Sequence, residues 1–151
     1  MLREQLKDSL ADGMRARDKI KTSTLRLILA AIKDRDIANR DGDNREGVGD
    51  DQILQILQKM VAQRRDSIVT YEEAGRLELA EQEREEIVVI ESFLPKQMDH
   101  DEIGAAVEVV VADLGCSSIR DMGTVMSALR EQYAGQMDFG KASGAAKKLL
   151  Q

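Results

Sequence analysis

The chain has 151 residues, of which 42% are hydrophobic, 33% are charged and only 3% are aromatic, and it contains one proline. This composition favours helices packed on helices and argues against a β-sandwich or barrel. The net charge of −6 argues mildly against a nucleic-acid partner, and the lone Cys116 excludes an internal disulfide and a cysteine-based metal site.

Four helices are expected before the single proline. Leu2, Leu6, Leu10 and Met14 recur every four residues and predict a first helix from about 2 to 15. Three further apolar patterns with a helical period follow: one over about 17–39, one that Asp50 or Asp51 caps and that stops near Gly75, and one over about 76–94.

The segment "RDGDNREGVGDD" (40–51) separates the second and third helices, and its composition is typical of a solvated loop. It superficially resembles a calcium-binding loop. Counted from Asp41, however, the sixth position is Glu46 where a glycine is needed, and the twelfth is Gln52 where a bidentate glutamate is needed. The sequence therefore predicts a charged surface loop here.

Pro95 marks a boundary between two helical parts. Proline disfavours helical geometry in the residue before it and lacks the N–H that would continue a helix. Asp99 then provides an N-cap, with Glu102 at the capping-box position of the next helix. We therefore expect a helix to end near Leu94 and another to begin shortly after the proline.

Three helices are expected after Pro95. The first carries the stripe Ile103, Val107, Val110, Val111 and Leu114 and ends at Gly115. Ser117 or Ser118 caps the second, which ends at Gly135, and Asp138 caps the third. The predicted fold is all-α, with a four-helix N-terminal part over 1–94 and a compact three-helix module over 95–151.

Two β-branched runs leave an alternative open. "EIVVI" (86–90) and "VEVVVA" (107–112) have strand propensity, although both lie inside longer patterns with a helical period.

No group of residues in the sequence has the composition and spacing of a catalytic centre. His100 lies between two aspartates at a helix start and has no evident nucleophile or orienting partner. No phosphate-binding glycine motif occurs, and the acidic run "LAEQEREE" reads as a solvated face. We expect no catalytic residues, no cofactor and no metal.

Because no apolar run suggests a signal peptide or a membrane helix, we expect a soluble cytoplasmic protein that does not contact a membrane.

Basic residues cluster at the start of the second helix. Residues 13–33 contain six basic side chains and one acidic side chain. These cations suit phosphate binding, or they neutralise the acidic fourth helix within the same fold. The candidate nucleic-acid-binding residues of this segment are Arg15, Arg17, Lys19, Lys21 and Arg26.

The C-terminal segment combines small residues with lysines. Gly123 lies inside a predicted helix. The last helix has a face of small residues, which includes Gly140, Ser143 and Gly144. Such faces pack closely on neighbouring helices or contact an RNA backbone. Lysines border the last helix at three positions, which are Lys141, Lys147 and Lys148.

Three segments resemble the YqeY family across essentially the whole chain. They are "TSTLRLILAAIKDRDI", "ESFLPKQMDHDEI" and "DMGTVMSALREQYAGQMDFGKAS", and the last two thirds also resemble the tail of the GatB subunit of tRNA amidotransferases. The resemblance implies a two-part helical fold whose C-terminal module touches tRNA, through residues such as Gly123, Gly135, Lys141, Lys147 and Lys148. The family is commonly described as carbon–nitrogen ligases with glutamine as amide donor, but no residue here matches a catalytic motif.

The leading hypothesis is a non-enzymatic accessory protein that binds tRNA or a tRNA-handling enzyme, with no DNA partner. A second hypothesis is a protein-interaction module that uses acidic residues of the fourth helix, such as Glu83, Glu85 and Glu86. A third is the amidotransferase-related ligase activity that the family description suggests.

Overall fold

The computed structural model describes residues 1–40 and 46–151, and these residues form an all-α fold without strands. The expected fold class is therefore confirmed, and the strand alternative is wrong, since both β-branched runs lie inside helices. The helices are α1 (Leu2–Arg15), α2 (Lys19–Ala38), α3 (Asp50–Glu73), α4 (Leu77–Glu91), α5 (His100–Leu114), α6 (Met122–Gln132) and α7 (Phe139–Leu150), with a 3₁₀ turn η1 (Ile119–Asp121) before α6.

The chain divides into two compact units, Met1–Leu94 and Pro95–Gln151. Each unit has its own cluster of buried apolar side chains. Because each unit buries its own core, we propose that each is an independently folding domain.

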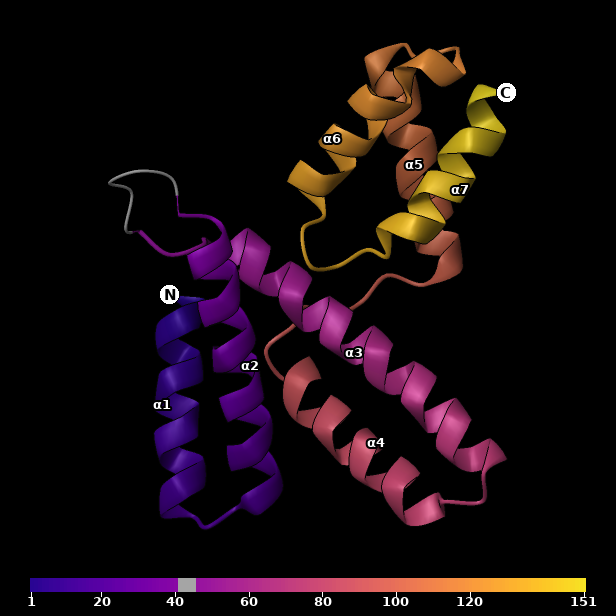
Figure 1. The fold of residues 1–151 in the computed structure, drawn as a ribbon. Coiled ribbons are helices and arrows are strands. Elements are labelled where there is room, and N and C mark those ends of the chain that lie inside the picture. Colours follow the sequence, from indigo (N-terminus) through magenta and orange to yellow (C-terminus); the bar gives the residue numbers. More distant parts are fainter. Residues whose placement is uncertain (41–45) are drawn as a thin grey trace. The chain divides into compact units, whose positions relative to one another are not determined.

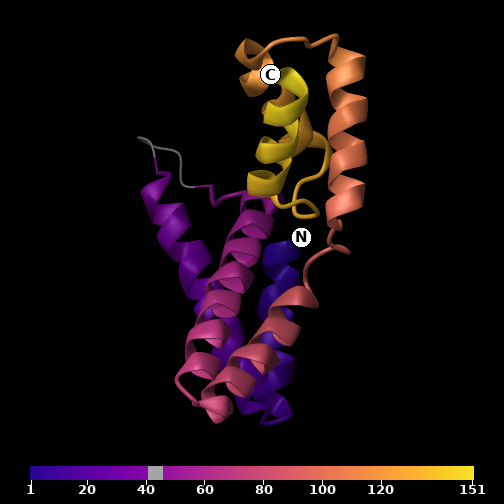
Figure 2. The same cartoon turned by 90° about the vertical axis from the view of Figure 1, so that its right-hand side faces the viewer.

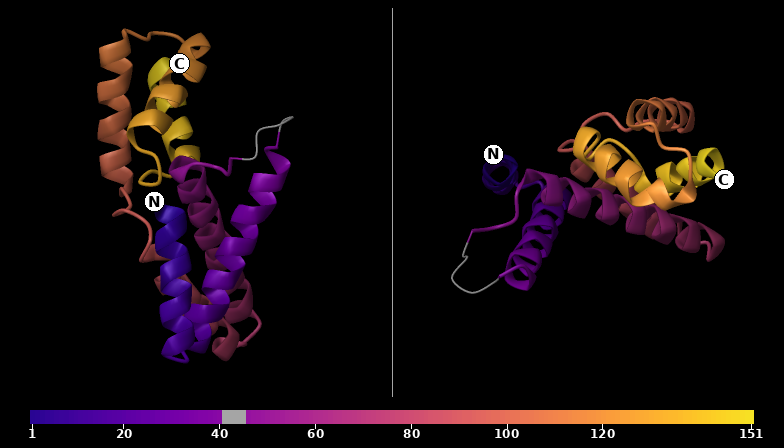
Figure 3. Two further views of the ribbon diagram at one scale, coloured as in Figure 1. Left: turned by 90° about the vertical axis from the view of Figure 1, so that its left-hand side faces the viewer. Right: turned by 90° about the horizontal axis from the view of Figure 1, so that it is seen from above.

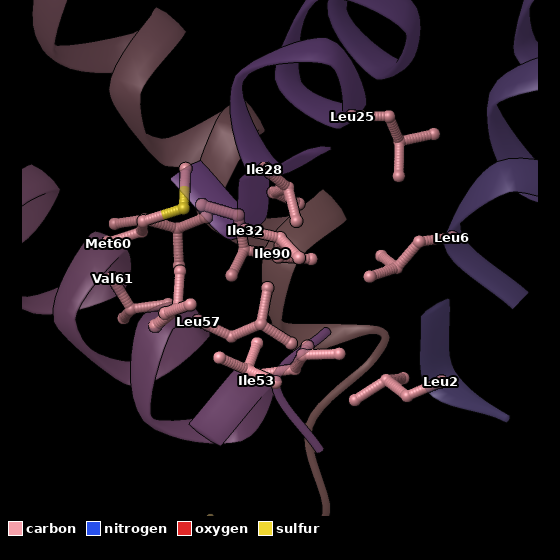
Figure 4. Packing of buried hydrophobic residues seen from close by; sticks show 13 residues of the cluster. Leu2, Leu6, Leu25, Ile28, Ile32, Ile53, Leu57, Met60, Val61 and Ile90 are labelled. Carbon is pink, nitrogen blue, oxygen red and sulfur yellow. The ribbon is translucent and has the colours of Figure 1, made fainter. Parts of the chain in front are cut away.

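The first unit consists of two helical hairpins, α1–α2 and α3–α4 (Figures 1 and 2). All four helices contribute to one core. Figure 4 shows Leu6 of α1 and Leu25 of α2 facing Leu57 of α3 and Ile90 of α4 across this core. All four side chains are fully buried, so this unit depends on aliphatic packing of the kind the low aromatic content predicted.

An ion pair joins three segments at one end of this unit. Both Nη atoms of Arg3 on α1 donate to the Asp36 carboxylate on α2, at 2.8 and 3.0 Å. The amide of Val48, just before α3, donates to the same carboxylate at 2.8 Å, and its carbonyl accepts from Arg3 at 3.1 Å. Gly47 lies directly beside the pair: a Cβ there would lie 2.9 Å from Cζ of Arg3, so a larger residue would have to displace the guanidinium.

The second unit starts with a segment that is tied to the α6–α7 turn. The Gln97 side chain donates to the Gly135 carbonyl at 2.6 Å, and the Met98 amide donates to the Gln136 carbonyl at 2.8 Å. Asp99 and Glu102 then form the predicted capping box of α5. The three helices pack around Val107, Val125 and Leu129. Figure 3 shows the ribbons of this unit in orange and yellow.

Two helix ends differ from the prediction. The third helix has Gly49 as its N-cap rather than either aspartate, because the Asp50 carboxylate accepts from the Leu2 amide of α1 at 3.3 Å. The fourth ends at Glu91, since the amides of Phe93 and Leu94 bond three residues back in a tightened turn.

Part of the expected charged loop, residues 41–45, lies outside the described residues, and so does the start of the calcium-loop alternative. Among the helices that are described, none has both the length and the hydropathy needed to cross a bilayer.

We expect Asp36→Asn to lower the free energy of unfolding by about 1–2 kcal/mol at neutral pH, because Arg3 loses its charged acceptor. The hydrogen bond from Arg3 holds the pKa of Asp36 below its ordinary value. The resulting stability is therefore present above the unfolded-state pKa, about 3.9, and is lost as the pH falls through the lower folded-state pKa. Denaturant titrations at several pH values check this, and an Asp36→Asn variant with the parent's acid sensitivity would contradict it.

We also expect the fragments Met1–Leu94 and Pro95–Gln151, produced separately, to fold on their own. Each keeps its complete apolar cluster and its helix caps. Circular dichroism should record a helical spectrum and a cooperative thermal transition for each fragment. A fragment that melts without cooperativity would show that the boundary at Pro95 does not separate two domains.

Candidate nucleic-acid interface

A short turn joins α1 to α2 (Figure 1). Arg17 in this turn lies in the left-handed region, with φ at 55°. The Asp18 amide donates to the Gly13 carbonyl at 3.0 Å, and the Arg17 amide donates to the Met14 carbonyl at 3.2 Å. This pair of bonds defines a Schellman motif, in which Arg17 occupies the position that usually carries glycine.

The same motif ends α3 and α5, and both of those turns have glycine at the equivalent position. Gly75 has φ at 72° and Gly115 has φ at 65°, each followed by the same pair of backbone bonds. Among described non-glycine residues, Arg17 alone has a positive φ. A side chain in this region costs of order 1 kcal/mol, so the chain retains a cation here at the expense of stability.

Arg17, Lys19 and Arg26 line one open concavity of about 430 Å³, together with Met14, Asp18, Thr22 and Ser23. The structure thus brings together three of the five basic residues that the sequence nominated in this segment. Arg15 instead pairs with Asp12 at 3.2 Å, and Lys21 does not line the concavity.

These cations do not neutralise the acidic fourth helix, so that alternative is wrong. Arginines on α3 and α4 pair with the acids instead, and so does Arg76 just before α4, which lies 3.1 Å from Glu78. Arg64 of α3 lies 3.0 Å from Glu86, and Arg65 lies 2.9 Å from Glu91, while Arg84 of α4 pairs with Glu72 and Glu81. Within the described ranges, Arg17, Lys19 and Arg26 have no ion-pair partner.

The expected solvated acidic face is also wrong for two of its carboxylates. Glu86 is only 8% exposed and accepts hydrogen bonds from Arg64 and Gln82. Glu83 faces the same arginine at 3.9 Å, and burial, aided by the neighbouring Glu86 charge, raises its pKa. The helical period of the sequence could not reveal this burial, because it does not show which residue of α3 lies opposite these glutamates. In the structure that residue is Arg64.

On the C-terminal helix α7, Lys141, Lys147 and Lys148 are all exposed. They lie three or four residues from Gly144, so they surround it on the helix surface. Gly144 is exposed, and a Cβ added there would meet nothing within 4 Å. In the part of the chain that the structure describes, these lysines have no ion-pair partner, and α7 itself contains no acidic residue.

The other nominated glycines behave differently from one another. Gly123 is exposed on α6 with nothing within 4 Å of an added Cβ, so it does not serve close packing, contrary to the packing interpretation. Gly135 is buried with φ at 76°, and its carbonyl accepts from Gln97. Its burial removes Gly135 from any direct RNA contact and gives it a structural role in the α6–α7 turn.

His100 is the first residue of α5 and is exposed. Over residues 1–40 and 46–151, no group of histidine, cysteine, aspartate and glutamate side chains is arranged to hold a metal ion. The strained conformation of Arg17 is the feature that sequence reasoning missed, because only the backbone reveals that this arginine stands in a glycine position.

Residues 3–150 match the protein family described as "Yqey-like protein". The chain therefore belongs to the YqeY family, as its sequence motifs indicated.

Similar curated proteins come from fungi. "Altered inheritance of mitochondria protein 41, mitochondrial" of Kluyveromyces lactis is 32% identical over 112 residues, which cover 72% of this chain and 58% of that protein. The protein of the same name in Eremothecium gossypii is 35% identical over 89 residues, 59% of this chain and 46% of that protein. An uncharacterized Schizosaccharomyces pombe protein is 32% identical over 95 residues, 63% of this chain and 73% of that protein. The matched region thus spans about half the length of the two mitochondrial relatives.

The expectation of a cytoplasmic protein is contradicted by these relatives, since the Kluyveromyces and Eremothecium proteins are named as mitochondrial. The expectation rested on the absence of long apolar runs. That criterion distinguishes membrane and secreted chains from others, but it does not distinguish the cytoplasm from the interior of an organelle.

We expect Arg17→Gly to raise the free energy of unfolding by about 1 kcal/mol, because glycine adopts the left-handed conformation without a Cβ clash. Thermal unfolding followed by circular dichroism measures the effect. Arg15→Gly is the matched control: this residue is helical, so the same change should destabilise the chain. A loss of stability in Arg17→Gly would show that the turn is not strained.

Proposed function

We propose that this protein is a non-catalytic accessory module that binds tRNA through exposed cationic surfaces. The observation that carries the proposal is the surface of α7, where three unpaired lysines surround the bare backbone of Gly144. A helix face without a side chain at its centre lets a sugar–phosphate backbone approach closely, and the surrounding ammonium groups meet its phosphates. The resemblance of this segment to the tail of the GatB subunit points to the same class of ligand.

Two further features support the proposal. Gly123 adds an exposed position without a side chain in the first turn of α6 of the same unit, where an added Cβ would meet nothing within 4 Å. The α1–α2 turn supplies further unpaired cations from the first unit, Arg17, Lys19 and Arg26. The net charge of −6 is compatible with RNA binding, because the acidic side chains of α4 are largely paired with arginines.

The acidic protein-interaction hypothesis loses support, because Glu83 and Glu86 face Arg64 rather than solvent. Of the three carboxylates it named, Glu85 alone is exposed. The ligase hypothesis has no support from the sequence, in which no residue matches a catalytic motif. The accessory role is therefore the proposal that the geometry supports best.

We expect the binding constant for tRNA to fall steeply between 50 and 200 mM salt, because phosphate contacts release counterions. In a Lys141→Ala, Lys147→Ala, Lys148→Ala variant, the slope of log K against log salt should fall by about 2–3, since each lost phosphate contact removes about 0.7–0.9. Filter binding or fluorescence anisotropy across a salt series measures both quantities.

A Lys7→Ala, Lys33→Ala, Lys59→Ala variant serves as the control, since it removes the same charge from exposed lysines of the first unit. It should keep the parent slope. Equal slopes for the α7 variant and the parent would contradict a tRNA contact on α7, and an affinity that does not depend on salt would contradict the proposal as a whole.

A further inference from the structure

The concavity at the α1–α2 turn has the composition of a small anion-binding site. Three cationic side chains and two hydroxyl groups line it, with Asp18 as the one carboxylate. That carboxylate is engaged, because its Oδ1 accepts a hydrogen bond from the Lys21 amide at 3.1 Å. The cations of the concavity form no ion pair with any carboxylate that the structure describes, so its charge is available to a ligand.

The concavity is larger than a single inorganic anion requires. Its volume of about 430 Å³ lies in the range of small-molecule sites, about 300–1,000 Å³. Part of its lining is apolar: Met14 is about half exposed, and its sulfur lies 3.9 Å from the Arg26 guanidinium. A thioether beside a planar guanidinium suits a flat ring, whereas Arg17 and Lys19 suit a phosphate.

From this composition we infer that the α1–α2 turn binds a nucleoside phosphate, with the phosphate between Arg17 and Lys19 and the base against Met14 and Arg26. The ligand can come from two sources, a free nucleotide or a nucleotide of an RNA strand. The inference rests on the proposed function only in that RNA is one of these sources. The strained backbone of Arg17 agrees with it, because glycine in that position would relieve the strain and lose the phosphate contact.

The test uses the full chain and adenosine monophosphate, followed by calorimetry and by amide chemical shifts. We expect saturable binding with shifts confined to residues 14–26, weaker binding of inorganic phosphate and no binding of adenosine. Arg17→Gly and Lys19→Ala should each weaken binding roughly tenfold, since each removes a charge-assisted contact to the phosphate. The thermal midpoint of Arg17→Gly, unchanged or higher, excludes unfolding as the cause.

Arg15→Ala is the matched control, because Arg15 ends α1 next to this turn and pairs with Asp12 outside the concavity. It should keep the parent affinity. The inference is overturned if adenosine monophosphate does not bind, if adenosine binds equally well, if inorganic phosphate binds as tightly as the nucleotide, or if Arg15→Ala weakens binding as much as Arg17→Gly.

A short RNA without terminal phosphates distinguishes the two sources. Displacement of the nucleotide by this RNA assigns the site to an internal phosphodiester, whereas failure to displace it assigns the site to a free nucleotide with a terminal phosphate. The outcome is separable from that of the tRNA proposal, which the lysines of α7 test. If the protein binds the nucleotide but not tRNA, only the proposed function is contradicted. If it binds tRNA but not the nucleotide, only this inference is contradicted.

Discussion

The buried ion pair between Arg64 of α3 and Glu86 of α4 adds a polar constraint to the aliphatic packing of the first unit, and it takes up charge that would otherwise lie on the surface. Glu86 is buried, and a buried carboxylate without a partner would be strongly destabilising. The observed register of the α3–α4 hairpin supplies this partner, because it brings the Arg64 guanidinium to 3.0 Å from the Glu86 carboxylate. The ion pair of Arg3 with Asp36 places a similar constraint on α1, α2 and the start of α3. Together these two pairs determine which charges are used inside the fold.

The charges left over define the surfaces that can meet an anionic ligand. Because α3 and α4 pair their acids with their own arginines, the basic α1–α2 turn keeps its cations unpaired. The lysines of α7 are likewise unpaired among the described residues, and they surround a glycine that presents only backbone. A chain with a net charge of −6 can thus present two local cationic surfaces. The proposals of tRNA binding and of nucleoside phosphate binding follow from this partition of charge.

Much of the fold was predictable from local signals. Asp99 with Glu102 and Asp138 act as the predicted caps, and Gly115 ends α5 as expected, because these features depend on a few consecutive residues. The partner of Glu86 and the cap of α3 were not predictable, because both depend on residues more than 20 positions away. For the candidate site, the sequence nominated five basic residues of this segment, and the structure places Arg17, Lys19 and Arg26 around one concavity. Nucleic-acid binding by these residues stays a prediction. The sequence could not reveal the strain at Arg17 or the burial of Gly135, which only tertiary structure determines.

The most direct test of the central claim is a titration of isotope-labelled protein with tRNA, followed through backbone amide signals. The glycines are convenient reporters, since Gly144 and Gly123 lie on the proposed contact surface, whereas Gly75 lies in the α3–α4 turn beside the acidic hairpin. We predict that the signals of Gly144 and Gly123 shift or broaden at low salt and recover at high salt, while that of Gly75 stays unchanged. Perturbation of Gly75 with Gly144 and Gly123 unaffected would contradict tRNA binding through the lysines of α7.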